Sequence, residues 1–373
     1  MAGVLQKDNT FTQAHLDRAI GEAQALRALM YFYLVRNFGE VPLKLTATVS
    51  DQDIVNIPKS NSEAILTQVV ADLKNAEPAL PLSYGNVDND KGRVTRYAVN
   101  AMLADVYLWM DKYTEAAAEC DKIINSGKFS LVDGQSFFSS VFLNGNSREG
   151  IFELQFDAQR LNPFFGIHPP QNKRWGAGLH LSDEVYGIDL INATPQVDVR
   201  GDKASYRSTD FTIWKYVGAD NDGNVFRAAD QSTANWIFYR YADVLLLKAE
   251  AINELNQPLE ASRIVKQIRN RATAIDLKVM DSLSKESMAG FILEERQREL
   301  AFEGKRWYDV LRNAKRNNYA RLQLLLDMAS ISLPTDRRQA AFGKLADKNS
   351  HYFPIYFYEL QTNKLLVQNP FYK

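Results

Sequence analysis

The sequence has one cysteine, almost no excess charge and no long apolar run. Cys120 is the single cysteine among 373 residues, which excludes an internal disulfide and zinc sites of the Cys₄ or Cys₂His₂ type. The formal net charge is -1, from 44 basic and 45 acidic residues, and this balance argues against a nucleic-acid partner. The longest apolar run covers residues 28–35, whereas a membrane-spanning helix needs about 20 residues. We therefore expect no membrane-spanning segment in this chain.

Motifs of the common catalytic and cofactor sites are also missing. There is no HExxH, G-x-S-x-G, Walker A or G-x-G-x-x-G pattern, and the four histidines are scattered. Asp220, Asp222 and Asn224 resemble the start of a calcium loop, but Gly223 comes fourth instead of sixth, and position twelve is Gln231. We therefore expect a solvated turn there, no cofactor and no enzyme activity. Whether a metal is bound stays open.

The composition, by contrast, is that of a globular chain with a substantial core. Hydrophobic residues make up 46% and charged residues 24%, which excludes disorder as the main state. Residues 292–315 are dense in charge. We expect them to form a packed helix with ion pairs, rather than a carboxylate pair for acid–base catalysis.

Helical periodicity dominates the first third of the chain. Apolar residues at steps of three or four predict one helix over 12–37 and a second from about Ser60 to 78. Residues 95–111 and 114–127 predict two helices joined by a short turn, which makes them antiparallel neighbours. The apolar face predicted for the first helix consists of Leu16, Ile20, Ala23, Leu26, Met30 and Leu34.

The layout of residues 93–124 returns at 240–272. A shift of 145 residues aligns Ala104 with Ala249, and likewise Ile123 with Ile268. A helix–turn–helix of about 34 residues with matching small residues looks like a tetratricopeptide repeat, and at least three repeats are normally stacked. The helices at 12–37 and 60–78 could form another pair, and residues 285–304 with the following helix a fourth. The fold class expected is mainly α, a tetratricopeptide-like scaffold of about four helix pairs with a long loop-rich insertion containing short strands.

The insertion, residues 131–238, loses the helical periodicity. Seventeen aromatic residues lie between Phe137 and Tyr239, and residues 151–156 alternate apolar and polar as in a half-buried strand. Loops of this length are usually functional. We expect one structural unit in three stretches: scaffold at 1–130, the insertion and ligand region at 131–238, and scaffold with an extended C-terminal tail at 239–373.

Aromatic and polar residues are mixed in the insertion as carbohydrate binding requires. Flat rings can stack on the C–H faces of sugars, while amide, carboxylate and guanidinium groups bond the hydroxyls. Each tryptophan could equally fill a core, and Phe137, Phe138, Phe142, Phe152 and Phe156 are expected to do so. The candidate ligand-binding residues are Asn172, Arg174, Trp175, Tyr206, Asp210, Trp214 and Trp236.

Six blocks, in order, resemble the SusD/RagB family of surface glycan-binding lipoproteins. They are EAQALRALMYFYLVRNFGEVPL, the block at 93–124, EGIFELQF, the block at 240–272, ILEERQRELAFEGKRWYDVLR, and FPIYFYEL with QNPFYK. The resemblance implies non-catalytic capture of oligosaccharides or other nutrients and their delivery to a SusC-type TonB-dependent transporter. It also implies attachment to the extracellular face of the outer membrane by an N-terminal lipidated cysteine. Neither that cysteine nor a signal peptide is found in residues 1–13, so we expect a trimmed N-terminus.

Two other functions stay open. One is a helical interaction scaffold without a small-molecule site, although the large insertion argues against it. The other is a glycoside hydrolase, which needs two carboxylates about 5–10 Å apart in a cleft. Asp183, Glu184 and Asp189 are the acidic residues nearest to the aromatic positions. The blocks that resemble the family are scaffold, so no ligand residue is transferred from it.

Overall fold

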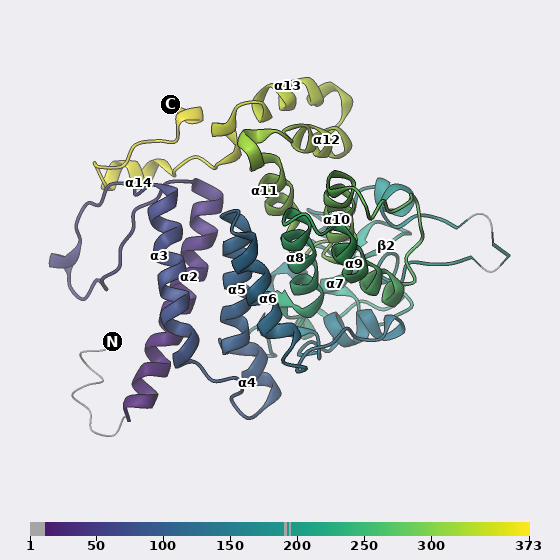
Figure 1. Cartoon of the computed structure of the whole chain (residues 1–373), viewed down its shortest axis with the longest axis horizontal. Coiled ribbons are helices and arrows are strands. Elements are labelled where there is room, and N and C mark those ends of the chain that lie inside the picture. Colours follow the sequence, from purple (N-terminus) through teal and green to yellow (C-terminus); the bar gives the residue numbers. More distant parts are fainter. Residues whose placement is uncertain (1–11, 190–191, 194) are drawn as a thin grey trace. The chain divides into compact units, whose positions relative to one another are not determined.

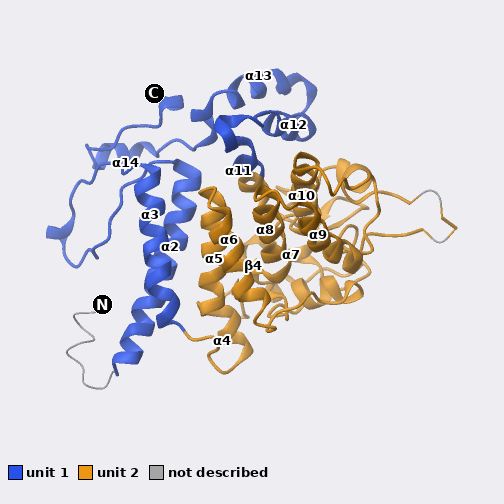
Figure 2. Ribbon diagram, in the orientation of Figure 1, with its two compact units in different colours: residues 1–80, 310–373 blue, residues 81–309 orange. Residues whose placement is uncertain are grey.

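The computed structural model describes residues 12–189, 192–193 and 195–373. Residues 1–11, where no signal peptide was expected, lie outside this part. The chain divides into two compact units, Met1–Leu80 with Val310–Lys373, and Pro81–Asp309 (Figure 2). Both units are mainly helical, as predicted (Figure 1). The unit boundaries differ from the breaks near 130 and 238, and the three-part division remains a prediction.

In the first unit, helices α2 (Gln13–Phe38) and α3 (Ser62–Ala79) pack along one another (Figure 1). The Thr12 side chain caps α2 by accepting from the His15 N–H, and Asn61 caps α3 in the same way. Gly39, at φ 72°, ends α2 in a conformation that a side chain would disfavour. The two helices predicted to form a pair therefore do so.

The face that α2 buries differs from the one expected. Leu26, Met30 and Leu34 are exposed, with Met30 at 50%. Small residues permit the close approach to α3 instead: a Cβ added to Gly21 would lie 3.1 Å from the Ala79 Cβ. Because α2 is apolar around most of its circumference, periodicity alone could not select the buried side. The residues that α2 buries are Leu16, Gly21, Ala25, Ala28, Leu29, Phe32, Val35 and Arg36.

The C-terminal segment of the first unit returns to the end of α2. The Phe353 N–H donates to Asn37 O at 2.7 Å, and Asn369 Nδ2 donates to Phe38 O at 3.2 Å. The tail therefore packs on a helix, as expected. The helices of this segment are α11 (Arg306–Tyr319, which starts in the second unit), α12 (Gln323–Ser332), α13 (Thr335–Leu345) and α14 (Phe357–Thr362).

The second unit contains the two predicted repeats. The first is α5 (Arg96–Trp109) with α6 (Tyr113–Ile124), and the second is α8 (Tyr241–Glu254) with α9 (Pro258–Ala272). Helix α6 packs against α8, so the repeats stack although the insertion separates them. Helix α10 (Lys285–Glu299) covers α8 and α9. The small residues at matching places, Ala104, Ala116, Ala249 and Ala261, are completely buried.

The turns inside the two repeats are alike as well. Asp111 has φ 58° and Asn256 has φ 65°, and these residues are equivalent under the shift that aligns the repeats. Asp and Asn tolerate the left-handed region better than other residues with a side chain. The two predicted tetratricopeptide-like repeats therefore agree in the backbone conformation of their connecting turns as well as in their helices.

The insertion starts and ends on one small sheet. Strand β1 (Gly150–Leu154) pairs antiparallel with β4 (Trp236–Arg240), and β2 (Tyr206–Arg207) pairs with β3 (Thr212–Ile213). Tyr239 on β4 donates its hydroxyl to Asp105 of α5 at 3.0 Å, which ties the sheet to the repeats. Two short helices, α4 (Val87–Gly92) and α7 (Trp214–Val217), complete this unit.

Both units also contain one-turn 3₁₀ or π segments. They lie at Asp51–Asp53, Gly134–Ser136, Ser139–Leu143, Pro163–Ile167, Leu181–Tyr186, Ala229–Gln231, Lys348–His351 and Pro370–Tyr372.

Candidate ligand-binding site

A buried network of charges joins the insertion to the repeat helices. Arg200 Nη1 lies 2.6 Å from Glu295, Arg240 Nη1 lies 2.6 Å from Glu299, and Lys215 Nζ lies 2.8 Å from Glu303. Every one of these side chains is buried. The network confirms the expectation of buried ion pairs at 292–315, but these residues form the end of α10 and the start of α11 (Arg306–Tyr319), with Glu303 in the turn between them, rather than one helix.

The charge states in this network follow from burial and pairing. Burial alone would raise the pKa of Glu299, but Arg271, Arg240 and Arg200 together hold that pKa well below its usual value. Burial lowers the pKa of Lys215 to about 8, and nearby Glu303 opposes this decrease. Because solvent does not reach these groups, they anchor the insertion rather than offering a site for acid–base chemistry.

Trp214 and Tyr206, two of the predicted stacking platforms, are core residues. Trp214 has 0% exposed surface and Tyr206 has 2%. The Trp214 indole N–H donates to Asp220 O at 3.0 Å, and its ring meets Phe226 edge-on at 5.1 Å. Neither ring can stack on a sugar. The expectation for both residues is corrected, because a loop-rich stretch needs its own apolar core.

Trp236 forms part of a partly buried aromatic cluster. Its ring lies 4.7 Å from that of Phe164 and stacks on Tyr216 at 5.7 Å. A Cβ added to Gly304 would lie 3.1 Å from the Trp236 ring, so this glycine makes room for the indole. The ring therefore serves mainly to pack β4 against its neighbours. The expected core residues Phe137, Phe138, Phe142 and Phe152 are buried, and Phe156 is half-buried.

Trp175 is the most exposed tryptophan of the insertion. It is 65% exposed, and Asn172 and Arg174 beside it are exposed too. The backbone of this loop is held in place, because the Arg174 N–H donates to Ile167 O at 2.9 Å. Below it, buried His168 stacks on Tyr216 at 5.6 Å, and burial lowers the pKa of this imidazole. The loop thus offers a solvent-facing indole with polar neighbours on a backbone that is held by hydrogen bonds.

The turn that carries Asp210 lies next to the loop of residues 171–177, which is called the Trp175 loop below. Lys173 Nζ donates to Asp210 O at 2.6 Å, and the Ala177 N–H donates to Phe211 O at 2.8 Å. The Asp210 carboxylate pairs with Arg207 at 2.6 Å, and hydrogen bonds from this guanidinium lower the pKa of Asp210 to about 2. Asp210 therefore stays ionised and keeps this turn in shape.

A hollow of about 290 Å³ adjoins the same loop through Asn172. Its walls combine the partly buried rings of Phe165 and Phe226 with the Gln171 amide. Sequence reasoning missed both phenylalanines, because residues so far apart in irregular segments show no shared spacing. The remaining residues that line the hollow are Gly166, Pro169, Arg227 and Ala229.

The structure thus brings four of the seven predicted site residues to one place. Asn172, Arg174 and Trp175 share an exposed loop, and Asp210 lies in the turn that this loop contacts. Tyr206 and Trp214 are buried. Such an arrangement suits a ligand with alternating apolar faces and hydroxyl edges.

The three carboxylates considered for hydrolysis serve local structure or lie open to solvent. Asp189 accepts hydrogen bonds from the side chain of Asn192 at 2.7 Å and from the Gln196 N–H at 2.8 Å. Asp183 accepts from the neighbouring Ser182 hydroxyl at 2.7 Å, and Glu184 is exposed. These positions give no support to an acid–base pair in a cleft.

In the described ranges, no group of three or more His, Cys, Asp and Glu side chains is placed to hold a metal ion. Asp220, suggested as a calcium ligand by its motif, accepts from the N–H groups of Asn224 and Val225, which is the geometry of a turn. Among the helices that the structure describes, none is long and apolar enough to cross a membrane.

The fold is that of the SusD superfamily. A SusD superfamily structure from Parabacteroides distasonis superposes with a TM-score of 0.73 at 25% identity, over 99% of this chain and 82% of that chain. A SusD homologue from Bacteroides thetaiotaomicron superposes with a TM-score of 0.68 at 23% identity, over 100% of this chain and 80% of that chain. The helical repeats described above are the common scaffold of these structures.

Sequence comparison leads to the same family. The SusD family model matches residues 187–372, and the model described as "Starch-binding associating with outer membrane" matches residues 4–108. A SusD-like protein, P38, of Formosa agariphila is 29% identical over 79% of this chain and 66% of its own length. A SusD-like protein of Bacteroides ovatus is 26% identical over 82% of this chain and 61% of its own length. The chain belongs to the SusD/RagB family, and it spans about two thirds of the length of these curated relatives.

Proposed function

We propose that this protein captures an oligosaccharide, without catalysis, on the surface formed by the Trp175 loop and the neighbouring hollow. The observation that carries the proposal is the exposed indole of Trp175 on a loop fixed by main-chain hydrogen bonds. Family membership supports a nutrient- or glycan-binding protein, and no enzyme family is indicated. Because the backbone of the loop is already held by hydrogen bonds, less backbone entropy is lost when a sugar stacks on the indole.

Delivery to a transporter forms the second part of the proposal. In it, the protein sits on the extracellular face of the outer membrane, held by an N-terminal lipid, and passes glycan to a SusC-like TonB-dependent barrel. Support comes from family membership and from the family description, which mentions association with the outer membrane. The stacked repeats offer an extended surface of the kind that binds protein partners.

Isothermal titration calorimetry against a panel of neutral and acidic oligosaccharides tests the binding site. For the glycan that binds, Trp175→Ala is expected to weaken affinity by about 1–2 kcal/mol, or roughly fivefold to thirtyfold, because the stacking surface is lost. Tyr356→Ala is the matched control, since Tyr356 is an aromatic residue with a similar exposure of 64% in the other unit.

Three results would count against the proposal. Unchanged affinity in Trp175→Ala would move the glycan site elsewhere. A panel without a single bound glycan, together with copurification of a barrel protein, would favour the interaction scaffold. Product release from a glycan that binds would instead indicate a hydrolase, and the same panel can be analysed for it by chromatography.

A further inference from the structure

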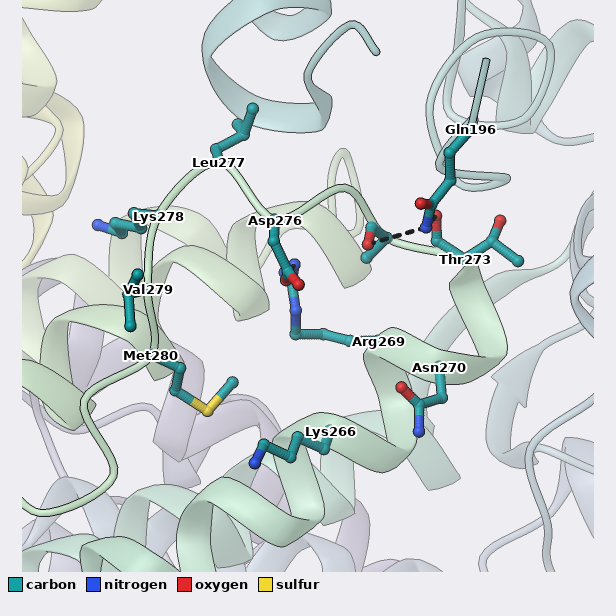
Figure 3. A pocket seen from close by; sticks show the side chains of 11 residues that line it. Gln196, Lys266, Arg269, Asn270, Thr273, Asp276, Leu277, Lys278, Val279 and Met280 are labelled. Carbon is teal, nitrogen blue, oxygen red and sulfur yellow. Dashed lines mark hydrogen bonds and ion pairs between the residues drawn. The ribbon is translucent and has the colours of Figure 1, made fainter. Parts of the chain in front are cut away.

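A second and larger hollow lies in the unit Pro81–Asp309, at the C-terminal end of α9 (Figure 3). Its volume is about 850 Å³, within the range typical of pockets for small ligands. One wall is α9, and the opposite wall is the connection 274–280 that leads to α10. Gln196, from the insertion, closes one end.

The frame of this hollow is fixed by internal hydrogen bonds. Arg269 Nη2 donates to Asp276 at 2.6 Å and to Ile275 O at 2.9 Å, while Nη1 of the same residue donates to buried Glu295 at 2.9 Å. Gln196 Nε2 donates to Thr273 O at 2.8 Å (Figure 3). The walls therefore hold their spacing without a ligand.

Two polar side chains of the lining have no partner in the described part of the chain. Lys266 and Asn270 are exposed and lie one turn apart on α9, so both occupy the face that borders the hollow (Figure 3). The other cations of the lining are compensated, Arg269 by Asp276 and Glu295, and Lys278 by Glu294. Lys266 is thus the uncompensated positive charge of this lining, with an amide beside it.

The rest of the lining limits what can bind here. No aromatic residue is among the described side chains that form the walls, so a nucleobase or a planar cofactor would have no ring to stack on. Val279 and Met280 give one aliphatic wall, against which the C–H face of a sugar ring can rest. The Asp276 carboxylate and the Asn270 amide can bond hydroxyl groups.

We propose that this hollow binds an acidic sugar unit, one that carries a carboxylate or a sulfate. The acidic group of the sugar pairs with Lys266. The hydroxyl groups of the sugar bond Asn270 and Asp276, and the sugar ring lies against Val279. A neutral sugar can accept a hydrogen bond from Lys266 but leaves its positive charge uncompensated, so the charge sets the preference. The inference rests on the proposed function for the ligand class, a glycan, but concerns a site separate from the Trp175 loop.

Calorimetry with three probes of similar length tests it: trigalacturonate for the carboxylate, a sulfated carrageenan oligosaccharide for the sulfate, and maltotriose as the neutral probe. At least one acidic probe is expected to bind more tightly than maltotriose. Lys266→Gln should weaken that binding by up to about fivefold, the range for an exposed ion pair. Raising sodium chloride from about 0.05 M to about 0.5 M should weaken it too, because salt screens the pair. Lys112→Gln, at an exposed lysine outside the lining, is the charge-matched control.

The inference is overturned if both acidic probes bind no better than maltotriose, or if no probe binds at millimolar concentration. Unchanged acidic-probe affinity in Lys266→Gln, or an equal loss in Lys112→Gln, overturns it as well. Its failure is distinguishable from that of the proposed function. If a glycan loses affinity in Trp175→Ala while neither acidic probe loses affinity in Lys266→Gln, the Trp175 site is upheld and this one is removed.

Discussion

Arg240 Nη1 lies 2.6 Å from Glu299 Oε1, and the two side chains have 1% and 0% exposed surface. Arg240 ends strand β4 of the insertion, and Glu299 ends helix α10 of the scaffold. Glu299 also pairs with Arg200 and Arg271, so three buried guanidinium groups share this carboxylate. The attachment of the irregular insertion to the repeats therefore depends on charge as well as on apolar packing.

Replacing Glu299 by Gln should destabilise the protein strongly. The substitution leaves Arg240, Arg200 and Arg271 with less compensating charge in a dry environment, at a cost of about 3–5 kcal/mol. Urea denaturation followed by circular dichroism measures this loss. The control is Glu260→Gln, whose pair with Arg263 is exposed and should contribute at most about 0.5 kcal/mol. Equal effects of the two substitutions would contradict the importance of the network.

Acid should weaken the fold partly through Asp243. Burial raises the pKa of this carboxyl, but Lys305 and Arg296, each 2.9 Å away, outweigh burial and lower it from 3.8 to about 2. Between these two pH values the unfolded chain binds more protons than the folded one. The stabilisation of about 2 kcal/mol is therefore complete above pH 4 and lost as the pH falls towards 2.

The variant Asp243→Asn isolates this contribution. Urea midpoints measured from pH 6 down to pH 2 should fall less steeply in Asp243→Asn than in the wild type, although the variant is less stable at pH 6. The exposed residue Asp222 provides the control, and Asp222→Asn should follow the wild-type curve. Parallel curves for Asp243→Asn and the wild type would refute the assignment.

The two tryptophans of the insertion that differ most in exposure should separate stability from binding. Trp214→Ala opens a cavity among buried rings and should cost about 3–5 kcal/mol. Trp175→Ala removes an exposed ring and should change stability by less than about 0.5 kcal/mol. Thermal and urea unfolding of both variants measure this contrast, and a large destabilisation in Trp175→Ala would mean that its ring is packed.

Helix α2 permits a similar comparison between neighbouring positions. Phe32 is 1% exposed and Met30 is 50% exposed. Phe32→Ala should cost about 3–5 kcal/mol, whereas Met30→Gln should stay within about 0.5 kcal/mol. Urea unfolding distinguishes them. A strongly destabilised Met30→Gln protein would show that the face predicted from periodicity is the packed one after all.

The repeats could be predicted from the sequence because their determinants are local. Matching small residues, such as Ala104 and Ala249, sit where the helices must approach closely, and short turns fix the pairing. The buried face of α2 could not be predicted, because the exposed residues Met30 and Leu34 are as apolar as the residues that pack against α3. Contact with α3, rather than periodicity, selects the face.

The candidate site was harder to predict, for a physical reason. In a segment without a regular periodicity, the spacing of the residues does not distinguish a ring that fills a core from one that faces solvent. Trp175 follows four polar residues, whereas Trp214 lies in the more apolar stretch 211–217, and the first is 65% exposed and the second 0%. The tertiary contacts with Phe138 and Phe226 decide the difference.

The Trp175 loop is held to the Asp210 turn through carbonyl oxygens, those of Asp210 and Phe211. Every residue type supplies such an oxygen, so these two hydrogen bonds depend on the backbone of the turn, which the Asp210–Arg207 pair maintains. On the loop itself, Asn172, Arg174 and Trp175 can be exchanged without moving the backbone that carries them. Under the proposed function, single substitutions at this surface would therefore alter the ligand preference while the folded frame beneath stays unchanged.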